Sequence, residues 1–305
     1  MRVAVIGIGS NSVRMLETEI GDGAFRRLRR DRAGTRLFAG LDAEGNLSGE
    51  SMLKTAEAVR RMAGAAQENG CERLHIFATS ASRDAKNGAD FMKLIRTVSG
   101  TELEIITGSE EAQLSFLGAT DVVPEGTSCG VIDIGGGSTE IVLGRGREIR
   151  RAVSCQMGAV RLYNVLSIDS EDDLAGVEEI ARKIFRETWN EEEAAEKADV
   201  WIGTGGTFTA LAAMVRDVPW TDRTCVHGTG IRRDEIAAIG RKLAGMNIQE
   251  RLKLGSLQPG RADIVVHGIC ILLCVMDEMG IDTLTVSEHG NLDGYIKKKY
   301  GVRCR

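Results

Sequence analysis

The chain has 305 residues, of which 43% are apolar, 27% are charged and only 3 are proline, and this composition excludes a disordered or fibrous protein. The length suits one large domain or two ordinary ones. Lys and Arg total 39 against 44 Asp and Glu, so the net charge is −5. That balance argues against a surface that attracts a polyanion as a whole, although a local anion site remains compatible with it.

The predicted elements of the first 123 residues alternate between strands and helices, which indicates a mixed α/β fold with parallel strand pairs. Ser48 is a typical N-cap and Gly70 lies just past the end of the helix that it opens. The expected strands are 2–8, 13–20, 24–31, 73–78 and 102–106, and the expected helices are 48–68, 90–98 and 109–120.

A turn-rich break at 124–128 separates this half from the next. It predicts two domains, 1–123 and 124–305, with a final helix that is free to pack back on the first domain. In the second half we expect strands at 129–134, 141–143, 148–153, 200–202 and 283–286, acidic helices around 168–196, and helices at 207–215, at 262–279 and at the C-terminus, ending in Lys297, Lys298 and Lys299.

Two features indicate the compartment. The apolar run at 1–7 is too short for a signal peptide, and no stretch reaches the length of a membrane span without charges, so we expect a cytoplasmic protein. The 7 cysteines are scattered without a CxxC pair, which is typical of reduced thiols. His267, Cys270 and Cys274 fall at helical spacing and leave metal ligation open, but their segment is apolar almost all round, which favours a buried helix face.

A repeat crosses the break. Residues 6–14 align with 132–140, with apolar residues, Gly and Ser at matching places, and each copy reads as strand, Gly/Ser turn, strand. The repeat predicts two related α/β domains.

Gly/Ser turns after strands expose backbone N–H groups that bind phosphate oxygens. A tight hairpin is the alternative for any single turn, but three turns in one α/β chain favour phosphate binding. The third turn, which contains Gly205 and Gly206, lies between a strand and a helix. The positive end of that helix, its N-terminus, would add to the attraction of the turn for an anion. Neither a P-loop nor a Rossmann motif is present. The candidate phosphate-binding residues are Gly9, Ser10, Asn11 and Ser12; Gly135, Gly136, Gly137, Ser138 and Thr139; and Gly205 and Gly206.

Acidic residues flank these turns. Asp133 ends a strand at the second turn and Glu140 follows on the return strand, where such acids commonly hold Mg²⁺ through water. Glu110 and Glu111 open a helix after Ser109, a natural N-cap, and the residues alone favour capping and dipole compensation. Arg83 is a candidate phosphate clamp, with a surface ion pair as the alternative.

Taken together, the motifs resemble those of the exopolyphosphatase / guanosine pentaphosphate phosphohydrolase (Ppx/GppA) family. The resemblance implies two ribonuclease-H-like domains of the actin/sugar kinase/Hsp70-like fold around an interdomain cleft, in the short two-domain form. It covers nearly the whole chain in order, through 8–12, 77–85, 107–112, 131–140, 203–207, 260–263 and 286–287.

The same resemblance implies hydrolysis of the terminal phosphate of inorganic polyphosphate, or of the 5′ γ-phosphate of guanosine pentaphosphate, with a divalent metal. Glu111 then corresponds to the catalytic glutamate that positions or deprotonates water. Asp133 and Glu140 correspond to metal-associated acids, the first two turns to phosphate loops, and Arg83 to an added clamp.

Two departures from the family pattern stand out. Gly7 stands where the family usually has Asp, and near 290–294 the usual Leu-Arg is absent.

We expect an exopolyphosphatase that uses Mg²⁺ or Mn²⁺ on polyphosphate. Only 4% of the residues are aromatic, which slightly favours polyphosphate over a nucleotide as the substrate. The alternatives are a guanosine pentaphosphate 5′-phosphohydrolase, and a non-catalytic sensor of phosphate or of guanosine penta- or tetraphosphate, motivated by Gly7. No nucleic acid or membrane partner is expected, and a homodimer is left open.

Overall fold

The computed structural model describes residues 1–189 and 198–305 and divides into two compact units. The first unit comprises residues 1–118 and 291–305, and the second comprises 119–290. The chain therefore passes between the units twice. The division follows Gly118, a few residues before the break at Pro124, and the last helix belongs to the first unit.

The first unit is built on a six-stranded sheet of order β12-β3-β2-β1-β4-β5. Strands β1, β2 and β3 form an antiparallel meander, and β4 and β5 continue the sheet parallel to β1. The predicted strands of this half are confirmed, and β12 adds a short edge. The strands are β1 (Arg2–Ile8), β2 (Ser12–Gly21), β3 (Ala24–Gly34), β4 (Arg73–Ala78), β5 (Leu103–Ile105) and β12 (Arg303–Cys304).

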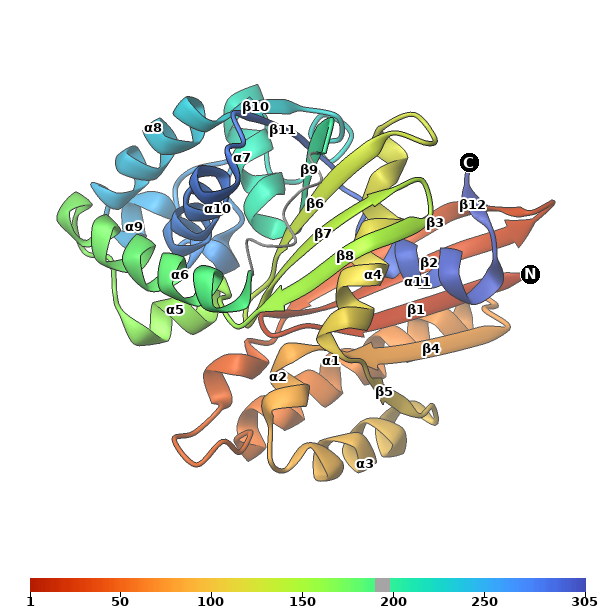
Figure 1. Cartoon of the computed structure of the whole chain (residues 1–305). Helices are drawn as coiled ribbons and strands as arrows, with labels where there is room; N and C mark the ends of the chain where they lie inside the picture. Colours follow the sequence, from red (N-terminus) through yellow and green to blue (C-terminus); the bar gives the residue numbers. More distant parts are fainter. Residues whose placement is uncertain (190–197) are drawn as a thin grey trace. The chain divides into compact units, whose positions relative to one another are not determined.

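Helices cover both faces of this sheet. Helix α1 begins after Ser48, whose side chain accepts a hydrogen bond from the amide of Ser51, as expected for an N-cap. Side chains of β2 alternate between a face toward α1 and a face toward α11, where Leu16 packs against Leu292 and Ile296 (Figure 1). The helices are α1 (Gly49–Glu68), α2 (Ser80–Asp84), α3 (Gly88–Ser99), α4 (Gly108–Ala119) and α11 (Asn291–Tyr300), with a 3₁₀ turn η1 (Leu37–Gly40).

The second unit has its own six-stranded sheet, of order β10-β11-β9-β6-β7-β8. The sequence did not indicate β10, α5, α8 or α9, and positions 190–196 of the predicted acidic helices lie outside the described residues. Its strands are β6 (Ser128–Ile134), β7 (Thr139–Arg145), β8 (Glu148–Cys155), β9 (Val200–Thr204), β10 (Gly230–Arg232) and β11 (Thr283–Val286), and its helices are α5 (Ala159–Val165), α6 (Leu174–Thr188), α7 (Gly206–Arg216), α8 (Arg233–Ala244), α9 (Ile248–Arg251) and α10 (Val265–Met279).

The two sheets repeat one topology. In each, a three-stranded antiparallel meander (β1-β2-β3 or β6-β7-β8) is followed by two strands parallel to its first member (β4-β5 or β9-β11). The internal repeat read from the sequence therefore corresponds to a repeat of structure, and the mixed α/β fold with two related halves is confirmed.

Helix α10 forms the centre of the second unit's core, packed by α5, α6, α7 and α8 (Figure 1). His267 is buried and its Nε2 lies 2.8 Å from the carbonyl oxygen of Leu166. Burial raises the pKa of the Cys270 and Cys274 thiols to about 12. This confirms a buried helix face, and within residues 1–189 and 198–305 no three His, Cys, Asp or Glu side chains converge as metal ligands.

No helix within the described ranges is both apolar enough and long enough to traverse a bilayer.

Candidate phosphate-binding and catalytic site

The first two Gly/Ser turns have the same geometry. The amide of Gly9 donates to the carbonyl of Ser12 (3.0 Å), and the amide of Gly135 donates to that of Ser138 (2.9 Å). The register of the flanking strands also matches, because Gly7 lies opposite Arg14 and Asp133 lies opposite Glu140.

The carbonyl groups of both turns are occupied by the segment that follows each meander. In the first unit the amide of Phe38, in η1, donates to the carbonyl of Ser10 (2.9 Å), and in the second unit the amide of Val160, in α5, donates to that of Gly136 (2.9 Å). These bonds hold each turn in place and engage one of its carbonyl groups. The backbone amide groups of such a turn are donors of the kind that bind phosphate oxygens.

The third turn leads into α7. Gly205 has φ +96°, a backbone conformation that favours glycine, and it precedes the first helical residue, Gly206. A side chain at Gly206 would overlap the guanidinium group of Arg261, so this cation lies directly on the N-terminus of α7. Arg261 is not among the residues that the sequence predicts for the site, although it lies in the family motif at 260–263. Two sources of positive potential thus coincide at this turn.

The acids of the second unit lie beside this turn. Asp133 and Glu140 form a cross-strand pair and share one face of the sheet. Both are buried, and Glu140 Oε1 accepts a hydrogen bond of 2.8 Å from the Ser154 hydroxyl. Asp133 Oδ1 is 2.7 Å from the point where a Cβ would stand at Gly205. The structure therefore brings Asp133, Glu140 and the third turn together.

The two acids at the start of α4 have different surroundings. Thr107, not Ser109 as predicted, is the N-cap, because its hydroxyl accepts from the amide of Glu110 (3.2 Å). Glu110 Oε2 in turn accepts from the amide (2.8 Å) and the hydroxyl (2.9 Å) of Thr107, which completes a capping box. The hydrogen bonds from Thr107 lower the pKa of the Glu110 carboxyl.

Glu111 is left for another role. Its side chain is 8% exposed, and its Oε2 lies 3.4 Å from Nη1 of Arg83. The same Arg83 nitrogen donates to the carbonyl of Ile106 (3.0 Å). Arg83 lies in α2, whose preceding residue Thr79 donates its amide to Ile8 (3.1 Å), at the strand end that leads into the first turn. In the first unit, Arg83 thus contacts the buried carboxylate of Glu111, which is not needed for capping, and Arg83 lies in a helix that is joined to the strand before the first turn.

Known proteins resemble this chain over nearly its whole length. The model of the Ppx/GppA phosphatase family matches residues 18–301. Exopolyphosphatase 2 of Mycobacterium tuberculosis is 35% identical over 310 aligned positions, which cover 96% of this chain and 97% of that protein.

Solved structures of similar proteins have the same fold as this chain. The Aquifex aeolicus PPX-GPPA enzyme superposes with a TM-score of 0.81 at 30% identity, covering 98% of this chain and 99% of that one. An exopolyphosphatase-like protein superposes with a TM-score of 0.89 at 29% identity, covering 98% of both chains. An exopolyphosphatase of Cytophaga hutchinsonii, at 24% identity and 99% coverage of both chains, shares the fold with a TM-score of 0.89.

Proposed function

The chain belongs to the Ppx/GppA phosphatase family, and on that premise we propose that it is an exopolyphosphatase that releases terminal orthophosphate from inorganic polyphosphate. The observation that carries the proposal is that the two acids at the start of α4 have different contacts. Glu110 caps the helix, whereas Glu111 is buried against Arg83. A buried carboxylate held in this way is suited to act on water. The curated exopolyphosphatase at 35% identity supports polyphosphate as the substrate.

In the proposed reaction the oxygen of a water molecule attacks the terminal phosphorus, and the anhydride P–O bond breaks. The leaving oxygen stays on the shortened chain as a phosphate oxygen. Glu111 orients the water and accepts its proton, and Arg83 holds the Glu111 carboxylate in position. The Gly/Ser turns and Arg261 bind phosphate oxygens, so that catalysis is mainly positioning and electrostatic stabilisation.

The acids of the second unit fit a magnesium ion. Mg²⁺ binds proteins through one or two carboxylates and takes its remaining ligands from water and substrate phosphate. Asp133 and Glu140 offer two carboxylates on one sheet face, next to the second and third turns. When bound there, Mg²⁺ or Mn²⁺ would neutralise charge on phosphate oxygens. We propose that Asp133 and Glu140 would hold the ion, with Asp133 placed beside the third turn.

One observation favours a second function, a non-catalytic sensor of phosphate or of guanosine penta- or tetraphosphate. The first turn carries Gly7 where the second carries Asp133, so the first unit lacks the carboxylate that the repeat would place there. A sensor would bind these ligands without releasing phosphate.

A matched pair of variants tests the proposal. Glu111→Gln should abolish phosphate release from polyphosphate in saturating Mg²⁺, whereas Glu110→Gln, the same change one residue earlier, should retain most of it. Assays on polyphosphate and on guanosine pentaphosphate, with and without metal, distinguish the two substrates. Full activity of Glu111→Gln would contradict the role of Glu111, and ligand binding by the wild type without any phosphate release would favour the sensor.

A further inference from the structure

Helices α4 and α11 of the first unit meet at a glycine. A Cβ at Gly294, in α11, would stand 2.6 Å from the carbonyl carbon of Leu114, in α4, and still closer to its carbonyl oxygen. Real Cβ atoms do not come within 3.0 Å of another heavy atom, and here the neighbour is backbone, which has no rotamer to change. Only glycine therefore lets α11 lie this close to α4.

The contact lies one helical turn along α4 from Glu111. Leu114 follows Glu111 by three residues, so the two are neighbours on the helix surface. The side chain of Leu114 belongs to the core of the first unit, together with Tyr295 and Ile296 of α11. Because close-packed elements transmit a displacement instead of absorbing it, a shift of α4 at Leu114 also moves Glu111.

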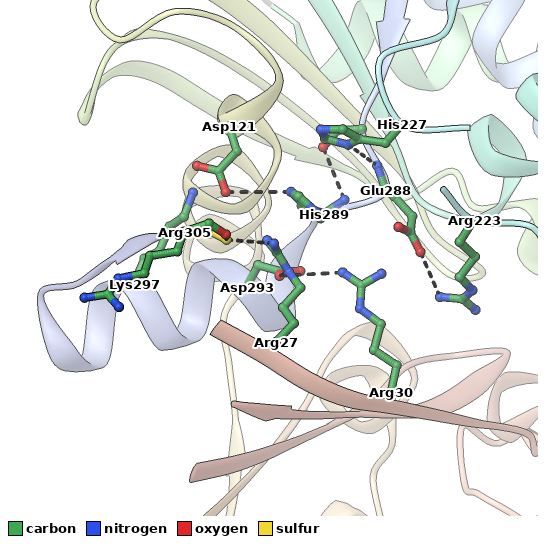
Figure 2. Close-up of polar contacts among 12 residues, drawn as sticks. Arg27, Arg30, Asp121, Arg223, His227, Glu288, His289, Asp293, Lys297 and Arg305 are labelled. Carbon is green, nitrogen blue, oxygen red and sulfur yellow. Dashed lines mark hydrogen bonds and ion pairs between the residues drawn. The ribbon is translucent and has the colours of Figure 1, made fainter. Parts of the chain in front are cut away.

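Helix α11 is fixed on the side of the sheet. Arg27 Nε, on β3, is 2.5 Å from Oδ1 of Asp293 in α11 (Figure 2). The ring of Tyr295 stacks on that of Phe77 in β4, with centroids 5.3 Å apart. The strand that follows α11, β12, pairs with β3. An atom added between the two helices is therefore expected to displace α4 and not α11.

Two lysines join the same helices further along. Lys297 Nζ donates to the carbonyl of Leu117 (2.6 Å), one of the last carbonyl groups of α4, and Lys298 Nζ donates to Oε1 of Gln113 (2.5 Å). A cation at the C-terminal carbonyl groups satisfies acceptors that the helix leaves open and complements the negative end of its dipole. Helix α11 thus holds α4 both in its middle and at its end.

The contact that Glu111 makes is sensitive to its position. Glu111 Oε2 lies 3.4 Å from Nη1 of Arg83, beyond the usual range of a hydrogen bond. Arg83 does not follow α4, because the same nitrogen donates to the carbonyl of Ile106, which precedes that helix. A withdrawal of α4 by roughly 1 Å would therefore separate the carboxylate from the guanidinium group.

We propose that Gly294 is a positioning residue: it sets the distance between α11 and α4 and so holds the Glu111 carboxylate against Arg83. The inference rests on the proposed function and adds to it a residue of the last helix that acts on the reaction only through Glu111. None of the three Gly/Ser turns lies in α4 or α11, so the contact should govern turnover and not the binding of substrate.

The test compares Gly294→Ala with Gly64→Ala. Gly64 lies inside α1 of the same unit, and nothing is within 4 Å of a Cβ there. Gly294→Ala should lower kcat for polyphosphate roughly a hundredfold, the cost of misplacing a catalytic group by about 1 Å, and change KM by less than about twofold. Gly64→Ala should leave both constants unchanged. Circular dichroism and thermal unfolding establish that each variant is folded at the assay temperature.

A double-variant cycle separates positioning from a general loss of structure. In an Arg83→Ala background the contact of Glu111 with Arg83 is already gone, so Gly294→Ala should lower the remaining kcat far less than it does in the wild type. Independent effects of the two substitutions would overturn the inference. So would a folded Gly294→Ala protein with the kcat of the wild type, and either result would leave the proposed function standing.

Two further measurements keep the inference open to refutation. If Gly294→Ala does not fold, Lys297→Met weakens the junction of α11 with α4 without adding an atom between them, and it should lower kcat roughly threefold. Lys299→Met, the same change at an exposed residue of α11, should not, and equal effects would overturn the inference. If the wild type releases no phosphate, the proposed function fails. A crystal structure of Gly294→Ala then decides, since an unchanged distance between Glu111 and Arg83 would refute the role of Gly294.

Discussion

Gly7 and Leu292 lie against each other in the first unit: a Cβ at Gly7 would stand 2.9 Å from Cδ2 of Leu292 and 3.1 Å from Cζ of Phe77. Leu292 belongs to the segment 290–294, in which the sequence shows the second departure from the family pattern. The two departures, at opposite ends of the chain, therefore meet in space. The carboxylate expected at position 7 is missing, and an apolar side chain of α11 fills the space beside it.

This contact predicts that Gly7→Asp alone does not restore a metal ligand. The new side chain is forced against Leu292 and Phe77, and overpacking of a core typically costs about 1–3 kcal/mol of the free energy of unfolding. Gly7→Asp combined with Leu292→Ala should recover much of that loss, because the smaller side chain makes room. The double variant, but not Gly7→Asp, should then show raised Mg²⁺-dependent phosphate release.

Thermal unfolding and Mg²⁺ titrations of both variants check this expectation. Gly21→Asp is a matched control in the same sheet, because nothing lies within 4 Å of a Cβ at Gly21. A stable and more active Gly7→Asp protein would show that Leu292 does not obstruct position 7.

The capping box predicts a dependence of stability on pH. The pKa of Glu110 is lowered in the folded protein, so its contribution is present above the ordinary value of about 4.3 and is lost as the pH falls through the lowered value. At pH 7, Glu110→Gln should lower the free energy of unfolding by roughly 0.3–1 kcal/mol, because a negative charge leaves the N-terminus of α4. Denaturant titrations at pH 7 and near pH 3 should show this difference shrink on acidification; an undiminished difference would contradict the assignment.

The third turn predicts that Gly206 and Arg261 act as one unit. Gly206→Ala displaces the guanidinium group that lies on the N-terminus of α7, so KM for polyphosphate should rise about as much as it does in Arg261→Ala. In the Arg261→Ala background, Gly206→Ala should add little, because the group that it displaces is gone. Gly255→Ala, where nothing lies within 4 Å of the new Cβ, is the control. Additive effects would show that Arg261 does not act at this turn.

The acidic pair predicts a change in metal requirement. Asp133→Asn should raise the Mg²⁺ concentration that gives half-maximal phosphate release by about tenfold or more, since a carboxylate is replaced by a neutral amide beside the second turn. Asp199→Asn, at an exposed acid of the same unit, should leave it unchanged. The measurement is activity against added Mg²⁺ after treatment with a chelator, and identical curves for Asp133→Asn and the wild type would exclude Asp133 as a ligand.

Local sequence patterns were sufficient to predict most of the fold. The alternation of strands and helices, the Ser48 cap and the repeat of the Gly/Ser turns depend on residues close together in the chain, and each appears in the structure. Helix α8 is not predicted, although it begins with a capping box that includes Glu235. Apart from Arg261, the proposed site residues come from the motifs and from the family resemblance, and they stay predictions, whereas the contacts of Glu111 with Arg83 and of Glu140 with Ser154 come from the structure.

The amino-acid sequence by itself thus determined the two α/β halves, their paired turns and the identity of the acids beside them, because hydrophobic period, caps and glycine placement act over a few residues. The tertiary structure alone decided which acid at the start of α4 faces Arg83, where Arg261 lies, and which side chains surround Gly7. Each of these depends on a contact between residues far apart in the chain, and local sequence patterns do not reveal such contacts.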